Sequence, residues 1–147
     1  MTAVTHYFPK RYSVNDDALR KILTDSRTIA TVGFSNNPKK PGYYVPQYMM
    51  VKGYRVIPVN PSIQEILGQK AYPDLLSIPE PVDIVQIFRA PSEVPAVVEQ
   101  AIQIGAKVIW MQIGAVNPEA GQRASDAGLA VVMDRCLMIE HKRLIMR

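Results

Sequence analysis

The residues best suited to chemistry follow the first strand-like segment of the chain and fit the binding of an anion. They are Gly33, Phe34, Ser35, Asn36, Lys39 and Lys40, in a polar loop that leads into a helix-like run. Glycine lets a backbone approach a phosphate, serine and asparagine supply short donors, and lysines supply charge without strict geometry. Amides at a helix N-terminus also attract anions. We interpret the loop as a phosphate-binding turn; the alternative is an exposed turn that only joins a strand to a helix.

The second strand-like segment ends in Val59, Asn60 and Pro61, which could form the wall of an adenosine pocket. Asn-Pro is also a common turn signal. A dinucleotide fingerprint needs three glycines in the first turn and an acidic residue here to bind the ribose. At the fingerprint positions of the first turn this chain has one glycine, Gly33, and Asn60 stands in place of the acid. The pattern therefore argues against NAD, and an NAD(P)-linked oxidoreductase remains only as an alternative.

Two further strand-like segments end in residues that would meet the same ligand. Phe88, Arg89 and Pro91 follow the third segment, and Gln112 and Gly114 follow the fourth. Phe88 and Arg89 could stack on or flank an adenine ring. A core phenylalanine beside a surface arginine is the alternative for this pair.

Groups typical of catalysis are scarce. His6 and His141 lack the spacing of metal ligands, and the only candidate for an activated thiol is Cys136 with Glu140 and His141. Residues 136 and 140 are four apart, so they would share a helix face. A Cys136-dependent acyltransferase is one hypothesis, and a buried, unreactive cysteine is the other.

Five apolar, strand-like segments position these residues: 28–33, 54–59, 83–88, 107–112 and 129–133. Their starts are 22 to 29 residues apart, which is too far for hairpins and typical of parallel strands joined by crossovers. Helices are predicted over 15–24, 43–52, 91–104, 118–127 and 137–146. In the second of these, Pro46 is expected in the first turn. Residues 61–82 are rich in turn residues, with at most one helical turn near Asp74.

This layout predicts an α/β fold: one doubly wound, Rossmann-like domain over residues 1–147, with residues 1–12 as a mobile extension. Its five-stranded parallel sheet would carry helices on both faces. The strand order expected is 3-2-1-4-5. Ligands of such sheets bind at the carboxyl ends of the strands, where the strand order reverses, and the candidate residues all lie at those ends.

Composition and charge limit the class of protein. Of 147 residues, 48% are hydrophobic and 20% charged, as in ordinary globular proteins. The net charge of +4 is concentrated in residues 1–60, which suggests a polyanionic ligand or a solvated basic surface. We find no nucleic-acid motif, signal core or apolar run of about 18 residues. A lone cysteine, Cys136, suits a cytoplasmic protein.

The chain resembles the small, stand-alone CoA-binding proteins, related to the CoA-binding domain of the succinyl-CoA synthetase alpha subunit. The resemblance spans roughly residues 15–145 and rests on TVGFSNNPKKPGYYV, MVKGYRVIPVNP, ILGQKAYPDLLSIPEPVDIVQIFRAP, AIQIGAKVIWMQIGAVNPEA and AGLAVVMDRCLMIEHKRL. It implies that coenzyme A or an acyl-CoA lies across the strand ends. Phosphates would meet Gly33, Ser35 and Asn36 with Lys39 or Lys40. The adenosine part would meet Val59, Asn60, Pro61, Phe88, Arg89 and Pro91, and the pantetheine part Gln112 and Gly114.

The resemblance also limits the activity expected. The larger synthetases have a second domain with a phosphorylated histidine and an ATP-grasp partner domain, and this sequence shows neither. We therefore expect a non-catalytic binding or sensing module. A regulatory or scaffold subunit of a larger acyl-CoA enzyme is a further alternative.

Overall fold

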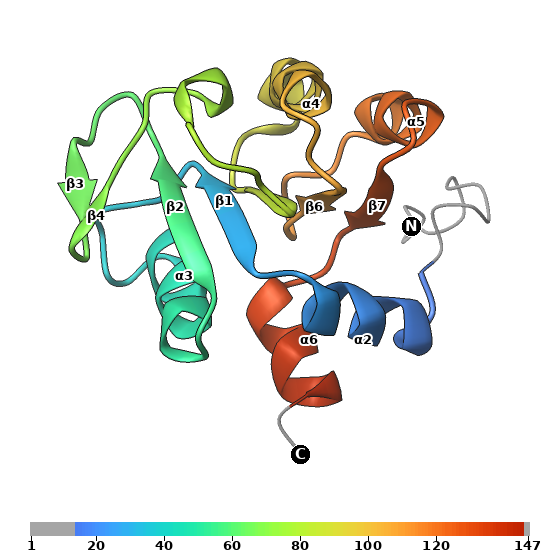
Figure 1. The fold of residues 1–147 in the computed structure, drawn as a ribbon, viewed down its shortest axis with the longest axis horizontal. Helices are drawn as coiled ribbons and strands as arrows, with labels where there is room; N and C mark the ends of the chain where they lie inside the picture. The colour runs from blue at the N-terminus through green and yellow to red at the C-terminus, as the bar shows by residue number, and fades with distance from the viewer. Residues whose placement is uncertain (1–13, 146–147) are drawn as a thin grey trace.

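The computed structural model describes residues 14–145, and its centre is one parallel sheet of five strands (Figure 1). The strands are β1 (Thr28–Val32), β2 (Arg55–Val59), β5 (Ile84–Ile87), β6 (Val108–Met111) and β7 (Ala130–Met133). Helices cover both faces, so the predicted α/β, Rossmann-like class is confirmed. The extension expected over residues 1–12 lies outside the described residues.

The strand order differs from the prediction. The sheet runs β2-β1-β5-β6-β7, so the third strand of the chain lies beside the first and not beyond the second. Residues 60–83 contain no crossover helix that could carry the chain outward past β2. Instead they turn back over β1, and the amide of Leu75 donates to Gln100 Oε1 on the helix after β5, at 3.0 Å. The strand order reverses between β1 and β5, which keeps the switch point beside the end of the first strand.

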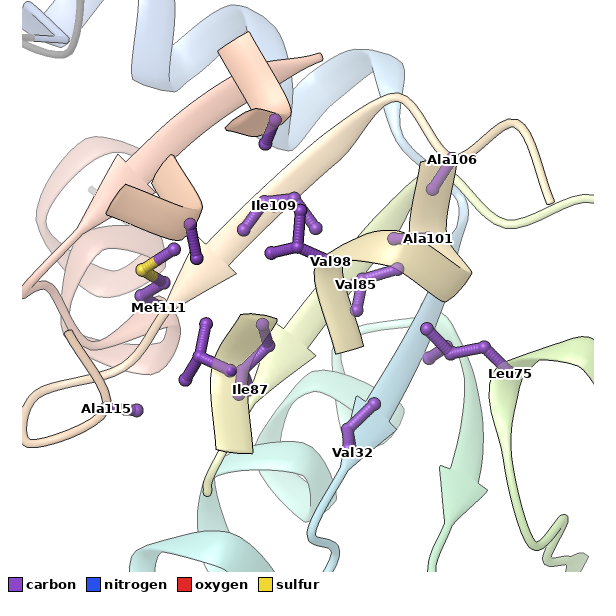
Figure 2. Close-up of a cluster of buried hydrophobic side chains, with 14 of the residues drawn as sticks. Val32, Leu75, Val85, Ile87, Val98, Ala101, Ala106, Ile109, Met111 and Ala115 are labelled. Atoms are coloured by element: carbon purple, nitrogen blue, oxygen red, sulfur yellow. The ribbon is translucent and has the colours of Figure 1, made fainter. Parts of the chain in front are cut away.

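Two hydrophobic layers cover the sheet. Helices α4 (Val94–Gln103) and α5 (Pro118–Asp126) cover one face, and α2 (Asp16–Asp25), α3 (Pro41–Val51) and α6 (Leu137–Leu144) the other (Figure 1). Strand side chains alternate between the layers: Ile109 and Met111 pack under α4 and α5 (Figure 2), whereas Val108 and Trp110 face the opposite way.

The start of α3 corrects one expectation. The helix begins at Pro41, two residues earlier than predicted, so Pro46 lies beyond its first turn. Pro46 has no N–H to give the carbonyl of Gly42, four residues before it. The amide of Ser35 donates to the Gly42 carbonyl instead, at 3.0 Å. The proline therefore leaves open the acceptor that holds the loop after β1 against the helix.

Other element boundaries follow local signals. The helix predicted from residue 118 begins there as α5, and Asn117 caps it by accepting from the amide of Ala120 at 3.0 Å. The segment predicted as a helix from residue 91 starts instead with a 3-10 turn, η3 (Pro91–Glu93), ahead of α4. The expected helical turn after Asp74 is present as η2 (Leu75–Ser77). Within the described residues, no helix is both long and apolar enough to span a membrane.

A small hairpin was not predicted. Strands β3 (Glu65–Ile66) and β4 (Gln69–Lys70) pair antiparallel around Leu67 and Gly68, whose φ angles are 53° and 75°. A two-residue turn with both φ values positive usually carries Asn-Gly. Leucine is uncommon at the first position of such a turn, so the sequence carries no signal that predicts this hairpin.

Candidate functional site

The carboxyl ends of the strands border a cleft of about 800 Å³. Its walls come from the loops after β1, β2, β5 and β6, from the start of α3 and from the start of α6. This volume lies within the range of ~300–1,000 Å³ common to small-molecule and cofactor sites. The position is the one expected from the reversal of strand order.

Most of the predicted site residues meet in this cleft. Those that line it are Gly33, Ser35, Asn36, Lys40, Asn60, Phe88, Arg89, Gln112 and Gly114. They come from four separate loops, and the parallel sheet brings all four loops to one edge. The site therefore depends on the whole sheet and not on the first turn alone.

Five predicted residues lie outside the cleft wall. Phe34 is fully buried, with its ring packed edge-on against Tyr43. Lys39 is exposed next to the cleft-lining Lys40. Val59 and Pro61 line a second, smaller cleft of about 420 Å³, which shares Arg89 with the first. Pro91 is exposed, and its carbonyl accepts from Asn117 Nδ2 at 2.8 Å.

Gly33 is required by a close backbone approach. Its φ is +87°, and a Cβ atom there would lie 2.3 Å from the carbonyl oxygen of Phe88. Its amide donates to the carbonyl of Val59 at 2.9 Å. The glycine therefore lets the ends of β1, β2 and β5 converge, a role separate from the contact with phosphate for which the sequence singled it out.

The loop after β1 is closed by its own hydrogen bonds. Asn37 N donates to Ser35 Oγ and Lys39 N to Asn37 Oδ1, each at 3.0 Å. Lys40 N donates to the carbonyl of Asn37, also at 3.0 Å. The loop therefore has a defined shape without help from another molecule.

Some donors of this loop remain for a ligand. Within residues 14–145, the amides of Asn36 and Gly42 have no protein acceptor, and both residues line the cleft. Ser35 Oγ uses a lone pair for Asn37 N, so its hydroxyl proton is still available. Lys40 adds a positive charge at the N-terminus of α3, where the helix dipole also favours an anion. These groups suit phosphate oxygens.

Asn60 has a structural role beside the cleft. Its Nδ2 donates to the carbonyl of Phe34 at 2.9 Å, and its Oδ1 accepts from the amide of Ser62 at 2.8 Å. One side chain thus ties the loop after β2 to the loop after β1. A carboxylate in its place could not donate to Phe34, which gives a physical reason for asparagine at this position.

The proposed thiol arrangement does not assemble. Cys136 lines the cleft, but the carboxylate of Glu140 pairs with Arg143 at 2.6 Å and with Arg135 at 3.3 Å. His141 Nδ1 lies 2.8 Å from the hydroxyl of Tyr48. Burial, together with the charge of Lys52, holds the pKa of His141 below its usual value. The carboxylate of Glu140 is therefore engaged by Arg143 and Arg135, and the imidazole of His141 by Tyr48 of α3.

Sequence reasoning missed several cleft residues. Those with large side chains are Tyr44, Ile63, Ile113, Met138 and Ile139. Apolar residues carry no obvious signal of binding in a sequence. Ile113 offered one, because it stands between Gln112 and Gly114, which are both predicted from the sequence to meet the ligand.

Comparison with known proteins identifies the family. A family model described as "CoA binding domain" matches residues 27–142. The chain belongs to this CoA-binding family. The protein YneT of Bacillus subtilis, which is uncharacterized, is 42% identical over 123 residues, 84% of this chain and 91% of YneT. A solved structure of a hypothetical protein from Pyrococcus horikoshii has a TM-score of 0.89 and 43% identity, and the match covers 91% of this chain and 94% of that one.

The CoA-binding domain is also similar to part of larger enzymes. The acetate–CoA ligase (ADP-forming) II of Archaeoglobus fulgidus is 32% identical over 100 residues. The match covers 67% of this chain but only 15% of the ligase. This match confirms the predicted relationship to the CoA-binding domains of acyl-CoA synthetases.

Proposed function

We propose that this protein binds coenzyme A or an acyl-CoA in the 800 Å³ cleft, as a binding or sensing module that performs no reaction of its own. The observation that carries the proposal is the closed loop after β1. The loop and the start of α3 bring Asn36 and Gly42, whose amides have no acceptor within residues 14–145, and the charge of Lys40 to a cleft in a member of a CoA-binding family.

The charges and shapes of the cleft suggest how the ligand lies. The phosphates meet the β1 loop and the start of α3. Arg89 lines both clefts, and its Nε lies 3.4 Å from Glu93 Oε1. Once this ion pair breaks, the guanidinium can bind a phosphate or stack on the adenine ring. The adenosine part lies toward β2, with Val59 and Pro61 in the smaller cleft. The pantetheine arm runs toward Gln112 and Gly114.

One observation favours binding without turnover, and a second favours CoA over NAD. Glu140 and His141 are engaged by other partners, so Cys136 has neither of the groups that the sequence suggested for its activation. Asn60 uses its amide to hold the β1 loop and offers no carboxylate to a ribose.

The test is calorimetric titration of the protein with CoA, dephospho-CoA and NAD. We expect CoA to bind and NAD not to bind. Lys40→Ala should weaken CoA binding about tenfold, since a charged hydrogen bond contributes about 1.5–3 kcal/mol and this lysine is exposed. Lys39→Ala is the matched control, because Lys39 does not line the cleft, and it should change affinity by less than about twofold. Binding of NAD in place of CoA, or equal effects of the two substitutions, would overturn the proposal.

A further inference from the structure

A chain of buried hydrogen bonds runs beneath the cleft, on the sheet face that α6 covers. Thr31 Oγ1 donates to Gln86 Oε1 at 2.8 Å, and Gln86 Nε2 donates to Gln112 Oε1 at 3.1 Å. The amide of Leu137, the first residue of α6, donates to the same oxygen at 2.9 Å. The side chains of Thr31, Gln86 and Gln112, which form this network, are all buried. The network links β1, β5 and β6 to the start of α6.

The Leu137 amide fixes which way the Gln112 carboxamide points. A backbone N–H can only donate, so it must face the oxygen of Gln112 and not the nitrogen. The NH₂ group of Gln112 consequently points away from Leu137. Within residues 14–145 it has no hydrogen-bond acceptor, although Gln112 is only 3% exposed and lines the cleft. Buried amide donors are seldom left unpaired, which points to an acceptor supplied by a ligand.

The surroundings of Gln112 are apolar and uncharged. The cleft-lining residues of the β6 loop and α6 are Gln112, Ile113, Gly114, Ala115, Cys136, Met138 and Ile139. Ile113 is 64% exposed and Ile139 49%. The cationic lining residues, Lys40 and Arg89, lie instead at the β1 and β5 loops. The cleft therefore has a cationic end and an apolar end, and the NH₂ group of the buried Gln112 lies at the apolar end.

We propose that the apolar end recognises the acyl thioester of an acyl-CoA with an uncharged, apolar acyl group. The NH₂ of Gln112 donates to the thioester carbonyl oxygen, and Ile113, Met138 and Ile139 contact the acyl chain. This rests on the proposed function. Free CoA carries a thiol there, which is a poor acceptor and leaves both isoleucines in water. Within residues 14–145, no cationic side chain lines this end of the cleft to meet a succinyl-type carboxylate.

Ligand analogues test the proposal on the unaltered protein. Calorimetric titration would compare hexanoyl-CoA, S-hexyl-CoA, succinyl-CoA and CoA; S-hexyl-CoA is a thioether with the chain but without the carbonyl. We expect hexanoyl-CoA to bind about tenfold more tightly than the thioether, as one buried donor left unpaired predicts. It should also bind at least about tenfold more tightly than CoA or succinyl-CoA.

Two kinds of variant separate the carbonyl contact from the chain contact. Gln112→Met should abolish the preference for thioester over thioether. Ile113→Ser and Ile139→Ser should each lower the preference for hexanoyl-CoA over CoA about threefold to fivefold, because each removes part of the apolar contact with the acyl chain. Leu76→Ser is the matched control, since Leu76 is 50% exposed and lies outside the cleft.

The outcomes distinguish this inference from the proposed function. Equal affinity for hexanoyl-CoA, its thioether and CoA would overturn the acyl site and leave CoA binding intact. If none of the CoA compounds bound, both the acyl site and the proposed CoA-binding function would be refuted. If Gln112→Met does not fold, the comparison of thioester with thioether on the unaltered protein still decides.

Discussion

Replacing Gly33 with alanine tests the convergence of strands on which the cleft depends. The added Cβ would lie 2.3 Å from the carbonyl oxygen of Phe88, 3.0 Å from its carbonyl carbon and 3.2 Å from Arg89 Cδ. Ordinary contacts begin near 3.4 Å, so the end of β5 must retreat by about 1 Å. The side chain of Arg89 can rotate away, but the backbone of Phe88 follows directly from the sheet.

Two costs add at this position. A left-handed φ costs alanine about 1–2 kcal/mol relative to glycine. Overpacking against backbone adds about 1–3 kcal/mol. Gly53 provides the control, because its φ is +99° and a Cβ there would meet nothing within 4 Å. Gly53→Ala should therefore show the first cost alone, and Gly33→Ala a total of about 2–5 kcal/mol.

Urea unfolding would measure both variants. With an m-value of about 2 kcal/mol/M, an excess loss of about 2 kcal/mol lowers the midpoint of Gly33→Ala by about 1 M relative to Gly53→Ala. Equal midpoints would refute the claim that β1 and β5 converge too closely for any side chain at residue 33. CoA binding by the Gly33 variant should fall as well, because the β1 loop and Arg89 are displaced together.

Three further outcomes follow from single side chains. Asn60→Asp should cost about 1–3 kcal/mol of unfolding free energy, because it sets an acceptor against the Phe34 carbonyl; calorimetry should show that it gains no NAD binding. His141 has a folded pKa below its usual value of about 6.5, so its contribution is fully present above pH 6.5 and is lost as pH falls toward the folded pKa. His141→Gln should thus flatten the fall in stability between about pH 7.5 and 5.5, measured by urea unfolding; an unchanged slope would contradict this. Burial tends to raise the pKa of Asp83, but the amides of Arg27 and Thr28 and the charge of Lys107 outweigh it and lower the pKa. Asp83→Ala should therefore cost about 1–3 kcal/mol at neutral pH, a difference that shrinks as pH falls below about 4; a difference independent of pH would contradict it.

The elements were predictable because their signals are local. Continuous apolar runs give the buried parallel strands, and Asn117 with Pro118 starts α5 as its sequence suggests. The cleft was predictable for a related reason: residues that follow parallel strands share one edge of the sheet. Asn36, Arg89 and Gln112 could therefore be grouped without knowing the strand order.

The remaining features depend on distant contacts. The order of the strands is decided by where residues 60–83 dock, and the bond from Leu75 to Gln100 joins segments that no local pattern relates. The early start of α3 relies on Ser35 for the carbonyl that Pro46 leaves open. Ile139 enters the cleft because α6 packs beside α3, where His141 meets Tyr48.

The bond between Ser35 and Gly42 also bears on the kinetics of binding. It closes residues 35–42 into a ring that is formed before any ligand arrives. Association then requires no reorganisation of the loop, and its rate should follow diffusion guided by the charge of Lys40 and fall as salt is added. The Ser35 amide, which donates to the Gly42 carbonyl of α3, should exchange with deuterium at nearly the same slow rate with and without CoA.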